Sequence, residues 1–123
     1  MNVSQTYSAV GEMGFTRLAA AFYRQVYDDD ILGPMYPKDD REGAEQRLRD
    51  FLIYAYGGPP RYLEQRGHPR MRARHASWRI DQVARDRWMQ LMNNALAAVS
   101  LPEEAEQHLR GFFEKMSTIL INQ

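Results

Sequence analysis

Apolar residues recur at helical spacing in four separate segments of this sequence, and no segment alternates between apolar and polar residues as a strand would. The segments cover about Gly14 to Tyr27, Asp39 to Tyr56, Asp81 to Val99, and Ser100 to Leu120. In the last of them the apolar stripe extends to Ile119 and Leu120. The pattern predicts an all-α fold, and 123 residues suit a single domain that spans residues 1–123.

Three of the expected helices begin at capping signals. Asp39 with Glu42, and Ser100 with Glu103, have the spacing of a capping box, and Asp81 is expected to cap the helix after it. The second helix is expected to end at the run from Gly57 to Pro59, because glycine takes the left-handed conformation and proline cannot continue a helix.

Residues 59–80 separate the second and third of these helices and look irregular, apart from a short helix expected from about Pro69 to Ala76. A connection of some 20 residues is unusual in a compact domain and is often functional. Six arginines against Glu64 make the stretch strongly basic; they are Arg61, Arg66, Arg70, Arg72, Arg74 and Arg79. These arginines can form an ordinary solvated surface, or they can pair with carboxylates, as the side groups of a large flat cofactor would require.

The amino-acid composition argues against several classes of function. Without cysteine the chain has no disulfide, thiolate metal site or cysteine nucleophile. A formal net charge of zero gives no reason to expect nucleic acid or an anionic membrane as partner. No apolar run reaches the roughly 18 residues of a membrane span, and the first residues do not resemble a signal peptide, so we expect a cytoplasmic protein.

The chain has three histidines, and His75 is the strongest candidate for a metal ligand. His68 lies in an expected turn before a proline, and His108 lies at the edge of the last apolar stripe. A lone histidine is more often structural than a ligand, but His75 is surrounded by arginines that suit the two propionates of a haem. Arg47 on the second helix is a further propionate candidate, and the apolar faces of the flanking helices can enclose the ring.

Aromatic residues with a polar atom at the end of the side chain, at positions expected in the core, give a second indication of a ligand site. Tyr23 and Trp88 lie on buried helix faces, and Tyr36 lies in the loop before the second helix. Buried O–H and N–H groups need acceptors. A backbone carbonyl can serve, and so can a diatomic ligand bound to haem. Ala44 is small and apolar and cannot donate a hydrogen bond.

These segments resemble the truncated haemoglobins, specifically group II, the O-type. The resemblance covers almost the whole chain and is most specific from Gly57 to His75. The matching residues are Ala21-Phe22-Tyr23, Met35-Tyr36-Pro37, Asp39-Asp40, 44–52, Tyr56-Gly57-Gly58-Pro59, 62–75 and Arg87-Trp88. The chain departs from the family in the spacing of Gly11 and Gly14, which are usually adjacent, and in Tyr56, where many relatives have tryptophan.

The resemblance implies a bacterial truncated globin fold, two helices packed on two, around haem b (iron protoporphyrin IX). His75 matches the proximal ligand, and Tyr23, Tyr36 and Trp88 match the distal hydrogen-bond donors. Ala44 and Leu48 match the distal helix positions that face the iron. Arg47 and Tyr62, and more weakly Arg74, match positions near the propionates. The remaining expected haem contacts are apolar: Phe51, Leu52, Met71, Ile80 and Met116.

The leading hypothesis for function is a haem protein that binds O2, CO or NO at five-coordinate ferrous iron. Three donors to one ligand would slow O2 release, which suits sensing or redox chemistry better than oxygen transport. A redox enzyme is the alternative, either an NO dioxygenase or a peroxidase-like protein that uses peroxide, and it needs an external reductase. A haem-free helical adaptor is the remaining reading, and either a monomer or a homodimer fits the sequence.

Overall fold

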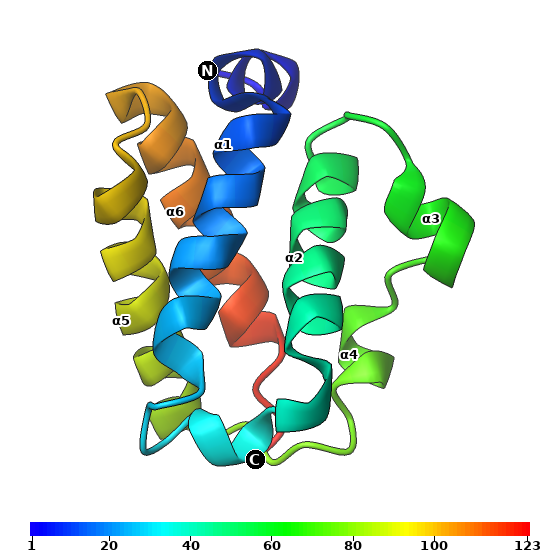
Figure 1. The fold of residues 1–123 in the computed structure, drawn as a ribbon, viewed down its shortest axis with the longest axis vertical. Helices are drawn as coiled ribbons and strands as arrows, with labels where there is room; N and C mark the ends of the chain where they lie inside the picture. Colours follow the sequence, from blue (N-terminus) through cyan, green and yellow to red (C-terminus); the bar gives the residue numbers. More distant parts are fainter.

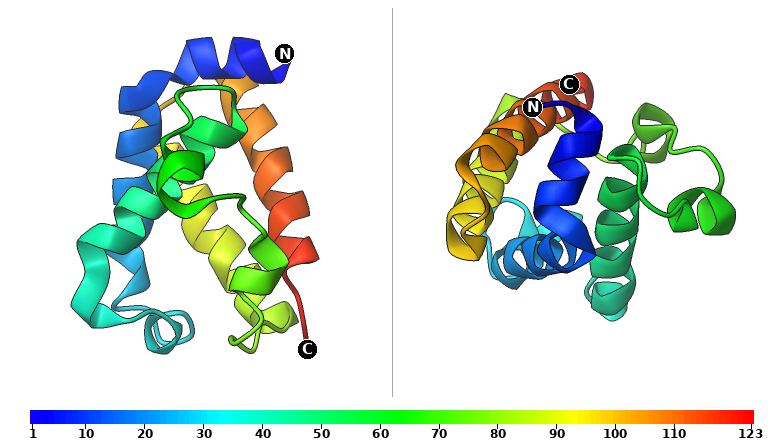
Figure 2. Two further views of the ribbon diagram at one scale, coloured as in Figure 1. Left: turned by 90° about the vertical axis from the view of Figure 1, so that its right-hand side faces the viewer. Right: turned by 90° about the horizontal axis from the view of Figure 1, so that it is seen from above.

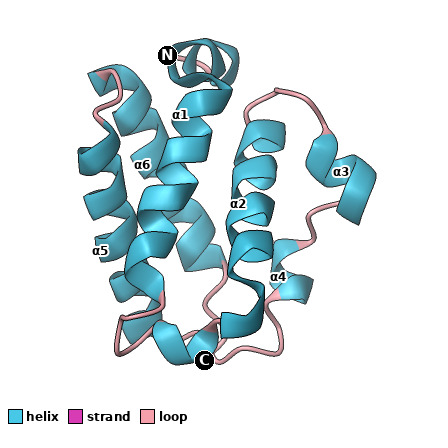
Figure 3. Ribbon diagram, viewed as in Figure 1, coloured by secondary structure: helices cyan, strands magenta, loops and turns pink.

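The computed structural model describes all residues from Met1 to Gln123 and contains helices and turns without a strand (Figure 3). Its long helices are α1 (Val3–Val26), α2 (Arg41–Ala55), α5 (Gln82–Val99) and α6 (Glu103–Ile119). Two short helices, α3 (Arg61–Arg66) and α4 (Met71–Arg74), lie between α2 and α5. Two 3₁₀ turns, η1 (Gly33–Met35) and η2 (Lys38–Asp40), connect α1 to α2.

The long helices form two antiparallel pairs, α1 with α2 and α5 with α6 (Figure 1). Helix α1 also packs on α5 and α6, so it joins the two pairs, whereas α3 and α4 lie on the outer side of α2 (Figure 2). The interior between the pairs is formed by fully buried side chains from all four helices: Phe15, Leu18, Phe22, Leu52, Ile53, Met92, Leu96, Leu109 and Phe113. No helix is both long enough and apolar enough to cross a membrane.

Helix α1 begins eleven residues before the expected start at Gly14, and it bends at Gly11. The Asn2 side chain accepts a hydrogen bond from the Gln5 amide, and the Gln5 side chain accepts one from the Asn2 amide, which stabilises the first turn. Gly11 has φ 70°, a left-handed conformation that suits glycine. The bend turns the first part of the helix across the end of the bundle, as the side view shows (Figure 2).

Both expected capping boxes are wrong. Helix α2 follows a 3₁₀ turn and has Asp40 at its N-cap, where the carboxylate makes no capping bond and instead accepts from Arg47 at 2.9 Å. Ser100 ends α5 in the left-handed conformation with φ 53°, and Pro102 precedes α6. Asp81 does cap α5, since its carboxylate accepts from the amide of Ala84 at 2.8 Å.

The interval from residue 59 to 80 is more ordered than the sequence predicts. Helix α3 was not expected, and α4 is shorter than the helix expected over residues 69–76. Gly57 ends the turn after α2 with φ 88°, as expected of a glycine stop. At the end of α6, Leu120 packs against the core as expected, but Ile119 does not belong to the apolar stripe, because it is 53% exposed.

Candidate functional site

A cavity of about 420 Å³ lies between the two helix pairs and the segment that carries α3 and α4. Of the 26 residues that line it, 19 are hydrophobic, so its interior suits a large and mainly apolar group. Every site residue that the sequence predicts lines this one cavity: Tyr23, Tyr36, Ala44, Arg47, Leu48, Phe51, Leu52, Tyr62, Met71, Arg74, His75, Ile80, Trp88 and Met116.

His75 follows the last residue of α4 and faces the cavity with one ring nitrogen uncommitted. Its Nδ1 lies 2.7 Å from the carbonyl oxygen of Met71. Because a carbonyl only accepts, Nδ1 carries the proton and Nε2 keeps a free lone pair. Metal-bound histidines usually have this arrangement, in which the second nitrogen donates to a backbone carbonyl and fixes the ring. The Trp78 ring packs edge-on against the imidazole, with the ring centroids 5.0 Å apart.

Asn122 holds the segment between His75 and Ile80 from the other end of the chain. Its Nδ2 donates to the carbonyl of Trp78 at 2.8 Å and to that of His75 at 3.3 Å. Its Oδ1 accepts from the amide of Ile80 at 2.9 Å. The backbone amide of Asn122 also donates to the Ile80 carbonyl at 2.9 Å. This set of bonds positions the loop after His75, and no pattern in the sequence predicts it.

The three predicted donors come from three different elements and share one wall of the cavity. Tyr23 on α1 packs edge-on against Tyr36, with the ring centroids 5.8 Å apart. Trp88 on α5 packs against Phe22 at 5.1 Å and Phe113 at 5.5 Å. Sequence periodicity predicts that Tyr23 and Trp88 lie on the buried faces of their helices. That the loop with Tyr36 packs beside them is seen only in the folded chain.

Burial raises the pKa of both phenols further above neutral pH. Burial raises the pKa of Tyr36 to about 12, although the nearby indole N–H of Trp88 acts in the opposite direction. The pKa of Tyr23 is also raised, first by burial and then by the neighbouring Tyr36 and Tyr27. Both hydroxyls are therefore available as hydrogen-bond donors at neutral pH.

One end of the cavity is polar and basic. Arg47, Tyr62 and Arg66 line both the main cavity and an adjoining hollow of about 210 Å³. Arg47 forms an ion pair with Asp40 at 2.9 Å, whereas Arg66 forms no ion pair within 4.0 Å. Arg66 belongs to the basic stretch whose arginines can pair with carboxylates, but it was not among the expected propionate contacts, which were Arg47, Tyr62 and Arg74.

Arg74 has a different environment from the one expected. Its guanidinium donates to the backbone carbonyls of Pro69 at 2.6 Å and Arg66 at 2.7 Å, and it lies 5.6 Å from the ring centre of Tyr62. These bonds join the end of α3 to the start of α4. Arg74 therefore lines the cavity while its charged group stabilises the turn before His75.

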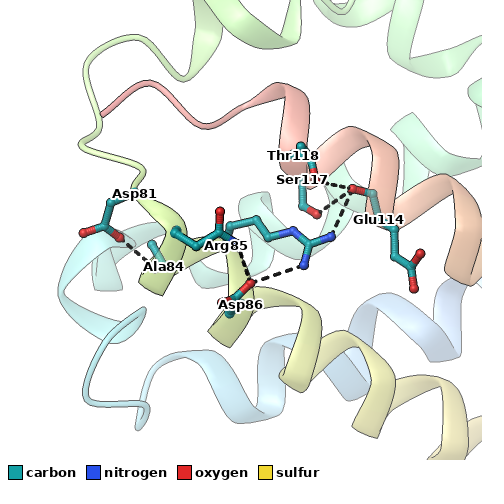
Figure 4. Close-up of polar contacts among 8 residues, drawn as sticks. Asp81, Ala84, Arg85, Asp86, Glu114, Ser117 and Thr118 are labelled. Atoms are coloured by element: carbon teal, nitrogen blue, oxygen red, sulfur yellow. Dashed lines mark hydrogen bonds and ion pairs between the residues drawn. The ribbon is translucent and has the colours of Figure 1, made fainter.

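A fourth arginine reaches the cavity wall from α5. Arg85 extends to α6, where its Nη2 donates to the carbonyl of Glu114 at 3.3 Å; that carbonyl also accepts from Ser117 and Thr118 (Figure 4). The Arg85 Nε is buried without a hydrogen-bond partner. Neither Arg85 nor Ser117 was expected in the site, because the sequence alone predicts that a charged or polar residue in a helix faces solvent.

The remaining lining residues are mostly core positions whose periodicity was recognised without their role in the cavity. They include Phe22, Leu32, Met35, Trp78, Phe112, Phe113 and Leu120. Together, the donor set fits a flat apolar group that carries a metal for His75 and carboxylates for the basic end.

Comparison with known proteins is consistent with this geometry. Residues 5–122 match the family model described as bacterial-like globin. The group 2 truncated hemoglobin YjbI of Bacillus subtilis is 36% identical over 117 residues, which cover 95% of this chain and 88% of that protein. A thermostable hemoglobin from Thermobifida fusca has a TM-score of 0.91 at 46% identity, with 95% and 96% of the two chains covered. The truncated oxygen-avid haemoglobin of Bacillus subtilis has a TM-score of 0.90 at 33% identity, with 95% and 98% covered.

Proposed function

This chain belongs to the bacterial-like globin family as a group II truncated haemoglobin with the two-on-two fold, and we propose that His75 holds haem b while Tyr23, Tyr36 and Trp88 bind the diatomic ligand. Membership of the globin family implies haem and the binding of small ligands such as O2. The roles of individual residues, the haem type and the preference among O2, CO and NO are the proposal.

The observation that carries the proposal is the state of the His75 ring. Its Nδ1 is committed to the Met71 carbonyl at 2.7 Å, so Nε2 is the nitrogen available to a metal in an apolar cavity. When bound, haem supplies an iron with one coordination position open to a diatomic ligand. The hydrogen bond to Met71 fixes the tautomer and makes the imidazole a more basic ligand.

The apolar wall residues exclude water and position the ring. Leu48, Phe51 and Leu52 project from α2, while Met71, Ile80 and Met116 come from other elements of the cavity. Ala44 is small, which leaves room for a ligand and for the donors that face it. At the basic end, Arg47, Tyr62 and Arg66 suit the two propionates, and Arg74 supports the turn beside them.

The donors act by stabilising partial negative charge on the ligand. Both phenols are protonated at neutral pH, since burial raises their pKa above the ordinary value of 10.0, and the indole of Trp88 only donates. Each hydrogen bond contributes about 0.5–1.5 kcal/mol, so each should slow ligand release by about 2- to 12-fold. The set of three donors favours tight binding of O2 over its rapid exchange.

The test is an absorption spectrum of the purified protein with haem in the ferric, dithionite-reduced and CO-bound forms. A strong Soret band that shifts on reduction and again with CO supports the proposal, and His68→Gly should leave these spectra unchanged. His75→Gly should lose the five-coordinate ferrous spectrum and recover it with added imidazole. A normal ferrous spectrum in His75→Gly without imidazole would exclude His75 as the ligand.

A second assay separates ligand binding from turnover. With NO or hydrogen peroxide and an external reductase, sustained consumption of reductant would favour the redox enzyme. Stoichiometric binding without continued consumption of reductant would favour the ligand-binding function.

A further inference from the structure

Trp78 is the aromatic residue whose ring contacts both the proposed iron ligand and one of the proposed donors to the diatomic ligand. Its indole packs edge-on against the His75 imidazole, with the ring centroids 5.0 Å apart. The same indole packs against the Tyr36 phenol at 5.9 Å, with an angle of 41° between the ring planes. Trp78 is half-buried and lines the main cavity together with both of these residues.

The backbone of Trp78 is held on both sides, which fixes where its indole lies. Its amide donates to the carbonyl of His75 at 3.1 Å, and this bond closes a turn that brings the indole against the imidazole. Its carbonyl accepts from the Asn122 side chain at 2.8 Å. The Trp78 ring is therefore a well-positioned surface on which a neighbouring side chain can pack.

The Tyr36 ring has fewer restraints of its own. Tyr36 ends the 3₁₀ turn η1, and its amide donates to the Gly33 carbonyl at 3.3 Å, which is long for such a bond. Its aromatic neighbours are Tyr23, with the ring centroids 5.8 Å apart, and Trp78. The position of the ring decides where the hydroxyl points. Without the Trp78 ring, Tyr23 would be the only aromatic neighbour left to hold Tyr36 in place.

The two contacts of Trp78 join segments that are far apart in the sequence. His75 and Trp78 lie between α4 and α5, whereas Tyr36 lies between α1 and α2, and both connections are at the same end of the molecule (Figure 1). Aromatic pairs prefer particular edge-to-face and offset geometries, so a shift of one ring changes the favourable position of the next. Because packed interiors transmit strain, these three rings are expected to adjust together.

We propose that Trp78 is a positioning residue that sets the orientation of the His75 imidazole and the place of the Tyr36 hydroxyl together. The inference rests on the proposed function, because it takes His75 as the iron ligand and Tyr36 as a donor to the bound diatomic. Through Trp78, a change in the Tyr36 ring alters the imidazole even when no diatomic ligand is bound. A donor that acted only on the ligand would have no such effect.

The first test is the iron–histidine stretching frequency of the ferrous protein in the absence of O2 and CO. Tyr36→Leu removes the ring that packs on Trp78, so we expect it to shift this frequency. Tyr36→Phe keeps the ring and loses only the hydroxyl, and it should retain the wild-type frequency. Trp88→Leu is the matched control, because the Trp88 ring contacts Phe22 and Phe113 and makes no ring contact with Trp78.

Two outcomes of this test would overturn the proposal. An unshifted frequency in Tyr36→Leu would mean that Tyr36 and the imidazole are independent. An equal shift in Trp88→Leu would mean that any large change in the cavity wall moves the imidazole. Neither comparison needs a substitution at Trp78, so the test holds even if a variant at that position does not retain haem.

A double-mutant cycle assigns the effect to Trp78. In the Trp78→Leu background, Tyr36→Leu should cause little further shift, because the contact between the two rings is already absent. In the Trp78→Phe background, which keeps an aromatic ring at this position, Tyr36→Leu should again shift the frequency. Additive shifts in the Trp78→Leu background would show that Tyr36 affects the imidazole by another route, and the role of Trp78 would be refuted.

The rate of O2 release gives a second readout, on the side of the diatomic ligand. Trp78→Leu should speed release by about 2- to 12-fold, the range expected for one lost donor, and Trp78→Phe should stay close to the wild type. Wild-type release in Trp78→Leu would contradict the proposal. An iron–histidine band that is missing from the wild type, or that survives in His75→Gly without imidazole, would instead refute the proposed function, which distinguishes the two failures.

Discussion

Asn122→Ala tests whether the polar contacts behind His75 position the haem ligand. The substitution removes two well-formed side-chain hydrogen bonds, to the Trp78 carbonyl at 2.8 Å and from the Ile80 amide at 2.9 Å, and a longer one to the His75 carbonyl at 3.3 Å. At about 0.5–1.5 kcal/mol for each of the two shorter bonds, the loss is about 1–3 kcal/mol. Asn122 is exposed and water can replace part of this, so we expect ~1–2 kcal/mol.

The assay is the rate at which haem passes to an excess of an apoglobin acceptor. A loss of ~1–2 kcal/mol in the segment that carries His75 corresponds to haem loss about 5- to 30-fold faster. Asn122→Asp keeps the acceptor oxygen and loses both donors, so its rate should lie between those of the wild type and the alanine variant. Gln123→Ala is the matched control, because that side chain only accepts a 3.5 Å bond from Arg79.

Wild-type haem loss in Asn122→Ala would refute this reasoning. So would an equal acceleration in Gln123→Ala, because general fraying of the last residues would then explain the result. A second readout is the iron–histidine stretching frequency of the ferrous protein. It should shift in Asn122→Ala if the imidazole is reoriented, and a loss of global stability alone would leave it in place.

Four further predictions concern the cavity. His75→Gly should abolish stable haem binding until imidazole is added, as followed by the Soret band. Trp88→Phe should speed O2 release by about 2- to 12-fold in stopped-flow measurements, since one donor is lost, and an unchanged rate would leave Trp88 with a packing role only. Arg66→Gln should accelerate haem transfer to the acceptor about 2- to 10-fold if its free guanidinium pairs with a propionate; an unchanged rate would remove it from those contacts. Because the pKa of Tyr36 is raised from 10.0 to about 12, the neutral phenol's contribution to stability is complete below pH 10 and is lost as the pH rises towards 12. Tyr36→Phe should flatten that part of the curve of unfolding free energy against pH.

The long helices, and the place of His75 on the cavity wall, could be predicted because each depends on a local pattern. Apolar spacing alone locates α2, α5 and α6 to within a few residues. His75 is the one histidine that the sequence places at the end of an expected short helix, within a basic stretch. The resemblance to a known family then identified the cavity residues on elements that only the folded chain brings together.

Helix starts were less predictable because several polar residues compete to cap each one. Asp39 and Ser100 both have a partner three residues on, yet the chain uses Asp40 and Pro102. Ion pairing decides the first case, since the Asp40 carboxylate binds Arg47, which lies seven residues away. The spacing of a capping box takes no account of such a competing partner two helical turns away.

Contacts that join distant segments were the least predictable part of the site. Asn122 reads as an ordinary polar residue near the end of the sequence, and its bonds to Trp78 and Ile80 span more than 40 residues. Arg85 reads as a solvated helix residue, yet it lines the cavity. These roles depend on how α5, α6 and the last residues of the chain, which include Asn122, pack against one another. The spacing of residues in the sequence does not predict that packing.

The size of the main cavity links the lifetime of the protein to its supply of cofactor. Without haem, water enters this partly open cavity but finds few hydrogen-bond partners on its mainly apolar wall, whereas bound haem covers that wall and adds its binding free energy to the folded state. We therefore expect the chain without haem to be less stable than the loaded protein and more easily degraded by proteases. The amount of protein in the cell would then follow haem availability even at a constant rate of synthesis.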